Sequence, residues 1–193
     1  MKKGRKKLFV VIVILLILCI SIGYAALSDN FKIKGTTNIT GNTWALSFTN
    51  IQVDTSASNV TASTAPHIVT GTSSDDYTQQ VEYEVTLAKP KDVYVFTVDL
   101  QNTGSIDAEI SSVSLSGLTS NASQYIEYTV KDVTNASSPR DAAVGDIISA
   151  SGGKKTYKVT TQFKDVTNEI LETYASSSVT LTLKFEINLV QHT

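Results

Sequence analysis

The apolar residues between Val93 and Leu118 recur at every second position, and this period of two constrains the fold more than any other feature. The alternation runs through Tyr94, Phe96, Val98 and Leu100, breaks at Asn102-Thr103-Gly104-Ser105, and resumes at Ile106, Ala108 and Ile110. Successive side chains of a β-strand point to opposite faces, so the pattern is typical of strands with one buried face. Because Asn, Gly and Ser favour turns, we predict a β-hairpin over residues 93–118.

The same alternation predicts further strands over residues 31–37, 44–53, 81–87, 126–131, 157–163 and 179–189. Its phase slips at Asn50 and again before Val113, and each slip indicates a β-bulge. Residues 54–80 are rich in Ser and Thr without a sustained period, which favours a long loop or a weakly paired edge. Only residues 168–174 resemble a helix. We therefore predict an all-β fold of about eight strands, a two-sheet antiparallel β-sandwich of the jelly-roll or Ig-like kind, with at most one short helix.

The first 25 residues have the anatomy of a secretory signal peptide. Five Lys and Arg residues lie among the first seven positions, a nearly uninterrupted apolar run covers residues 8–23, and small residues precede a cleavage point between Ala25 and Ala26. Cleavage there would leave residues 26–193 as a single β-sandwich domain. An uncleaved leader is the alternative, because residues 8–27 are long enough to span a bilayer and to anchor the domain. In both cases the basic end stays in the cytoplasm and the domain is exported, with membrane contact only through the leader.

The charge of the remaining chain excludes some classes of partner. Without the leader, 11 basic and 18 acidic residues remain, a net charge of about −7. A domain of this sign is a poor candidate for binding nucleic acid or anionic lipid. The sole cysteine, Cys19, lies in the leader, so the exported part has neither a disulfide nor a thiol nucleophile.

No motif for catalysis is present. The two histidines, His67 and His192, form no HExxH pair, and the sequence has no GxSxG elbow and no phosphate-binding glycine loop. Asp75 and Asp76 are suitable ligands for calcium, but adjacent acids in a Ser-rich segment are usually solvated. Aromatic residues at strand spacing usually belong to the core rather than to a ligand face. We expect a protein that is not an enzyme, with no catalytic, cofactor or metal site.

Several segments resemble one family. They are Gly23-Tyr24-Ala25-Ala26-Leu27-Ser28-Asp29, the stretch from Phe31 to Thr36, Trp44-x-x-x-Phe48-x-Asn50-Ile51, Phe96-x-Val98-x-Leu100-x-Asn102-Thr103-Gly104-Ser105, and Phe185-x-Ile187-x-Leu189-Val190-Gln191. The chain is thereby similar to the TasA/camelysin-like family of Gram-positive proteins, which are exported with a signal peptide cut by a SipW-type signal peptidase. The resemblance implies a jelly-roll-like sandwich outside the cell and, for the fibre-forming members, polymerisation by donation of an N-terminal strand to the next subunit.

Three functions follow as hypotheses. The first is an exported surface or biofilm-matrix protein that assembles with itself or with a related matrix subunit by donating residues 26–37, inserting Phe31 and Ile33 into its neighbour. In that hypothesis the strand does not fold back into its own subunit. The second is a monomeric binding module or adhesin that uses residues 54–80. The third, implied by the resemblance alone, is a camelysin-like metallopeptidase.

Overall fold

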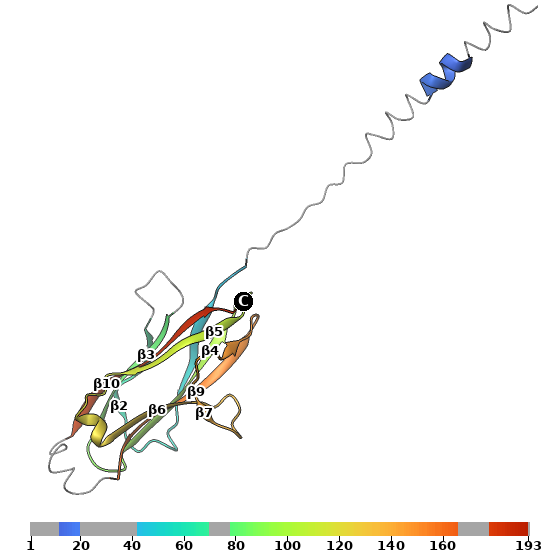
Figure 1. Ribbon diagram of the computed structural model, residues 1–193. Helices are drawn as coiled ribbons and strands as arrows, with labels where there is room; N and C mark the ends of the chain where they lie inside the picture. The colour runs from blue at the N-terminus through green and yellow to red at the C-terminus, as the bar shows by residue number, and fades with distance from the viewer. Residues whose placement is uncertain (1–11, 20–41, 70–77, 166–177, 193) are drawn as a thin grey trace, which may run out of the picture. The chain divides into compact units, whose positions relative to one another are not determined.

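The computed structural model describes residues 12–19, 42–69, 78–165 and 178–192 (Figure 1). The chain divides into two compact units, residues 1–40 and 41–193. Residues 12–19 of the first unit form an α-helix. Among the described residues, no helix is long and apolar enough to cross a membrane. The strand predicted over residues 31–37 and the helix predicted over residues 168–174 lie outside the described residues.

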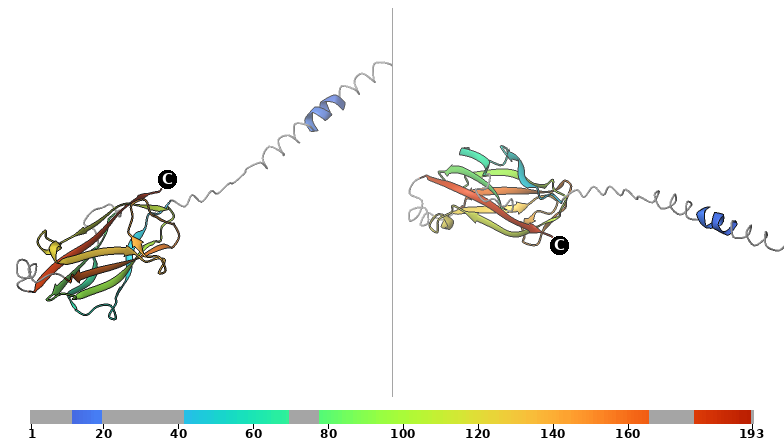
Figure 2. Two further views of the ribbon diagram at one scale, coloured as in Figure 1. Left: turned by 60° about the horizontal axis from the view of Figure 1, so that its bottom comes forward. Right: turned by 90° about the horizontal axis from the view of Figure 1, so that it is seen from above.

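The second unit consists of two antiparallel five-stranded sheets that lie face to face (Figure 2). Sheet A contains, in spatial order, β1 (Leu46–Val53), β4 (Val93–Asn102), β9 (Gly153–Phe163), β6 (Ile126–Asp132) and β7 (Arg140–Asp141). Sheet B contains β2 (Ala62–Val69), β3 (Thr78–Leu87), β10 (Val179–Gln191), β5 (Ala108–Ser116) and β8 (Ile147–Ile148). A single 3-10 turn, η1 (Ala122–Gln124), connects β5 to β6. The predicted all-β, two-sheet antiparallel sandwich is confirmed.

The core lies between the sheets and is built from the alternating apolar residues of the long strands. Aromatic rings of one sheet pack on rings of the other: Phe48 lies 5.4 Å from Phe185, and Tyr83 lies 5.0 Å from Phe96, between ring centroids. Tyr83 and Phe96 are almost completely buried. These four aromatic residues therefore belong to the core, as their strand spacing predicts.

The hairpin predicted over residues 93–118 is wrong, because β4 belongs to sheet A and β5 to sheet B. The intervening turn crosses between the sheets. Its backbone N–H groups bond to the segment before β1 instead of closing a hairpin: Thr103 N donates to Ala45 O at 2.8 Å, and Ser105 N to Thr43 O at 2.9 Å. A Cβ at Gly104 would lie 2.4 Å from Thr43 O, so the close approach of the two backbones requires glycine there.

Both predicted bulges are confirmed. The β1–β4 register shifts between Thr49 and Gln52, where Asn50 takes a φ of 52°. The β5–β10 register passes from Ile110↔Leu189 to Ser112↔Asn188, which leaves Ser111 as the extra residue.

Residues 54–80 are a loop only in part, because β2 forms within them. This strand pairs irregularly with β3 at the edge of sheet B, which agrees with the weakly paired edge that was one of the two predictions for this segment. The strands β7 and β8, of two residues each, were not predicted.

Candidate functional site: the open edges of the sandwich

The predicted site residues divide into those that the structure describes and those that it does not. Ala25, Ala26, Phe31 and Ile33 lie outside the described residues, as do Asp75 and Asp76. The structure therefore describes the surfaces that could receive a donated strand, but not the donated strand itself.

The two histidines lie apart in the fold, on the surface. His67 lies on β2 with a ring nitrogen 3.2 Å from Ala65 O, and His192 follows β10 with its Nδ1 3.0 Å from Oε2 of Glu109. Within the described ranges, no group of three or more His, Cys, Asp and Glu residues is placed to hold a metal ion.

Among the residues that the structure describes, both sheets end in strands whose outer edges are open over most of their length. On one side the outermost strands are β1 and β2. On the other side, β6 pairs with β7 only at Lys131 and Asp132, and β5 pairs with β8 only at Ala108 and Glu109. Open edges present unpaired backbone N–H and C=O groups, which can add a further strand.

On β5, apolar side chains point toward the core and yet remain accessible. Val113 is paired with Ile187 and Leu115 with Phe185. Directly opposite residues of an antiparallel pair share one face of the sheet. Because Ile187 and Phe185 are fully buried, Val113 and Leu115 also face the core, but Leu115 is 39% exposed and Val113 is half-buried. The core layer is thus open beside β5 among the described residues.

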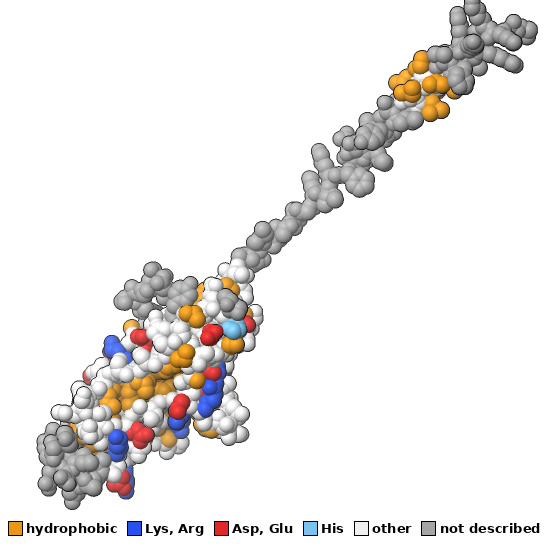
Figure 3. Space-filling view, viewed as in Figure 1, with side chains coloured by type: hydrophobic (Ala, Val, Ile, Leu, Met, Phe, Trp, Pro, Cys, Tyr) orange, Lys and Arg blue, Asp and Glu red, His pale blue; other side chains and the backbone are white. Residues whose placement is uncertain are grey.

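The facing strand β6 shows the same feature. Tyr128 is paired with Thr161, which is fully buried, so its ring also faces the core while remaining half-buried. Its hydroxyl is shielded from solvent and has no hydrogen-bond partner in the described part of the chain. An apolar band runs lengthwise along this side of the molecule (Figure 3), in the region where β5 and β6 lie in Figure 1. We call the opening between β5 and β6, bordered by Val113, Leu115 and Tyr128, the β5/β6 seam.

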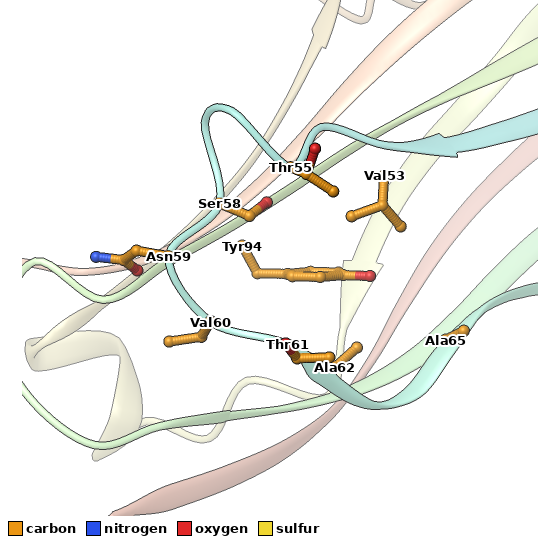
Figure 4. A pocket seen from close by; sticks show the side chains of 9 residues that line it. All are labelled: Val53, Thr55, Ser58, Asn59, Val60, Thr61, Ala62, Ala65 and Tyr94. Carbon is orange, nitrogen blue, oxygen red and sulfur yellow. The ribbon is translucent and has the colours of Figure 1, made fainter.

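A second opening lies on the other side, between β1 and β2. Val53 is paired with the buried Phe96, and Ile68 with the buried Val81, so both face the core, although they are 41% and 37% exposed. A cavity of about 390 Å³ lies here, lined by Val53, Thr55, Ser58, Asn59, Val60, Thr61, Ala62, Ala65 and Tyr94. Figure 4 shows the ring of Tyr94 between Val53 and the segment from Val60 to Ala62.

Four charged residues, Asp132, Arg140, Asp146 and Lys155, form a cluster. Asp132 accepts hydrogen bonds from Arg140 at 3.0 Å and from Lys155 at 3.1 Å, and the same two cations contact Asp146 at 2.6 and 3.3 Å. Asp132 is almost completely buried and is paired with the buried Tyr157. The contacts among these residues join β6, β7 and β9 to the turn before β8. Because the two acids and the two bases also neutralise one another, we interpret the cluster as structural.

Burial raises the pKa of Asp132, but hydrogen bonds from Thr134 and the ammonium group of Lys155 outweigh burial and hold the pKa below its ordinary value. The carboxylate of Asp132 therefore stays ionised in the folded protein at neutral pH.

Comparison with family models, with curated proteins and with solved structures finds no match to this chain.

Proposed function

We propose that the chain is an exported, non-enzymatic surface or extracellular-matrix protein whose subunits assemble by donating residues 26–37 to a neighbour. The observation that carries this proposal is the exposure of core-facing apolar residues, Leu115 above all, beside open strand edges. Such a surface favours the addition of a further strand whose side chains complete the core.

The donated segment has the pattern that an acceptor edge requires. Phe31 and Ile33 alternate with Lys32 and Lys34, so one face of the strand is apolar and the other basic. Each apolar side chain buried in a partner contributes roughly 1.5–3 kcal/mol, in addition to the hydrogen bonds of the ladder. Donation thereby yields a stronger junction than simple pairing of two edges.

The leader supports export. Cleavage between Ala25 and Ala26 by a SipW-type signal peptidase would free the donated segment at the new N-terminus. The mature protein would then act in the matrix or at the cell surface of a Gram-positive cell. If the leader stays uncut, the domain remains anchored to the membrane.

Assembly of the secreted protein tests the proposal. We expect the mature chain, residues 26–193, to form fibres or large oligomers by sedimentation velocity and electron microscopy, and the Phe31→Asp variant to remain monomeric. Lys32→Arg is the control, since it keeps the positive charge and the alternation predicts its side chain on the opposite face of the strand. A mature chain that stays monomeric at high concentration across a range of pH would contradict the proposal.

A monomeric binding module is the second candidate, favoured by the cavity beside Tyr94 and by its lining from residues 55–62. Long loops on rigid sandwiches often carry binding residues. If this function holds, replacing the exposed Thr55 and Thr61 with bulky residues should abolish ligand binding and leave the circular dichroism spectrum unchanged.

A further inference from the structure

The open edges differ in how well they would accept an added strand, and three of them carry features that hinder addition. The edge of β1 is interrupted by its bulge, where Asn50 has a positive φ. The strand β2 contains Pro66, which has no backbone N–H, and its register shifts twice. The edge of β6 carries Glu127 and Lys131, and its last two residues are already paired with β7. Bulges, prolines and charges are the means by which sheets prevent edge pairing.

The edge of β5 has no such protection beyond its bulge. Residues 111–116 read Ser-Ser-Val-Ser-Leu-Ser, without a charge or a proline. After the extra residue Ser111, the stretch pairs with β10 in unbroken register up to Ser116↔Lys184. Just before it, Ile110 already has partners, because its N–H donates to Asp146 O at 2.9 Å and its carbonyl accepts from Gly145 N at 2.9 Å. Within the described ranges, the free edge therefore comprises residues 111–116, about 20 Å of strand.

Charge identifies the strand that fits this edge. The outer face of sheet B carries Glu82, Glu84, Glu109 and Glu186 against a single Lys184. A strand that places Phe31 and Ile33 beside the core-facing residues of β5 must place Lys32 and Lys34 on this acidic outer face. On β6 the same lysines would lie on the face of Lys131, whose neighbour across the ladder is Lys158.

We infer that residues 111–116 of β5 are the acceptor edge and that residues 31–36 of a second copy of this chain are their occupant. This inference rests on the proposed function, which makes that segment available. Phe31 and Ile33 then cover Val113 and Leu115 and close the β5/β6 seam, while the lysines approach Glu109 and Glu186.

A pair of matched variants of the mature chain tests the choice of edge. Leu115 on β5 and Ile68 on β2 lie on opposite sides of the same sheet, both face the core, and they are 39% and 37% exposed. We expect Leu115→Asp to raise the concentration required for assembly by about tenfold or more, and Ile68→Asp to assemble like the parent. Retained circular dichroism shows that each variant is folded.

The reverse result, with Ile68→Asp defective and Leu115→Asp normal, would overturn the choice of β5 while leaving strand donation intact. A parent chain that never assembles would instead refute the proposed function. If Leu115→Asp does not fold, Ser114→Lys decides, because Ser114 is exposed and lies opposite Glu186. Assembly should weaken with Ser114→Lys and strengthen with Ser114→Glu, and both effects should shrink at high salt. Equal assembly of these two variants would also overturn the inference.

Discussion

Asn102 determines the path of the chain at the end of β4. Its side chain is fully buried; its Nδ2 donates to Ile106 O at 2.8 Å and to Ile148 O at 3.0 Å, and its Oδ1 accepts from Gly104 N at 3.0 Å. The sequence predicts a turn here, because Asn and Gly favour turns. It does not predict the change of sheet, because that depends on partners 46 residues away, at Ile148, and before β1.

Replacement of Asn102 tests this role. Asn102→Ala should lower the free energy of unfolding by about 1–3 kcal/mol, since buried backbone groups lose their partners. Asn121→Ala is the control, because Asn121 is exposed and its side chain caps no helix. Urea denaturation of both variants measures the difference, and equal midpoints would show that the turn forms without the Asn102 amide.

The charged cluster gives the fold a pH dependence at the residue scale. The pKa of Asp132 is lowered in the folded state, so its stabilisation is complete above the ordinary carboxyl pKa of about 3.9 and is lost as pH falls through the folded value. Asp99 behaves in the same way. Burial raises its pKa, but hydrogen bonds from Thr156, Asn50 and Lys154 outweigh burial, so the pKa lies below its ordinary value.

We therefore expect Asp132→Asn to cost about 1–3 kcal/mol at neutral pH and to flatten the loss of stability as the pH falls below the ordinary carboxyl pKa of about 3.9. Asp141→Asn, which removes an exposed partner of Lys131, should change stability by less than about 1 kcal/mol at any pH. Unfolding midpoints in urea across the acidic range measure both. A variant of Asp132 with the same acid slope as the parent would contradict the assignment.

At the scale of elements, predictability follows exposure. The strand β10 is buried on one face throughout, from Leu181 to Leu189, so its alternation is complete and predicts the strand. The strand β2 is an edge whose residues are mostly exposed, and its segment therefore has no period to detect. The strands β7 and β8 are held by tertiary pairing over two residues each, which no local pattern encodes.

The two faces of β10 provide a direct test of its phase. Leu183 is fully buried opposite Tyr83, and Leu183→Asp should prevent folding, because an uncompensated charge in an apolar site costs at least several kcal/mol, comparable with the stability of a domain. Thr182 is exposed opposite Glu84, so Thr182→Asp should cost no more than about 1 kcal/mol of like-charge repulsion. Expression level and circular dichroism distinguish them, and equal damage would mean that β10 is buried on both faces.

At the scale of the whole molecule, the sequence predicts a donor better than an acceptor. The alternation at Phe31 and Ile33 is local and can be read directly. The exposure of Leu115 cannot be predicted from the sequence, because this residue belongs to an apolar alternation that normally indicates burial. The exposure of Ile68 cannot be predicted either, because its segment has no period that assigns it to a face. Only the strand order, which places β5 and β2 near the edges of sheet B, shows that their core-facing side chains are incompletely covered.

The stability of a shortened chain distinguishes donation from a strand that folds back into its own subunit. All members of the described hydrophobic core belong to the unit of residues 41–193. If residues 26–40 act on a neighbour, a chain of residues 41–193 should unfold cooperatively with the same urea midpoint as residues 26–193 measured below the assembly concentration. If the segment belongs to its own sheet, its removal should cost roughly 1.5–3 kcal/mol for each of Phe31 and Ile33. A large drop in midpoint, or loss of folding, would therefore place the strand in its own subunit and refute assembly by donation.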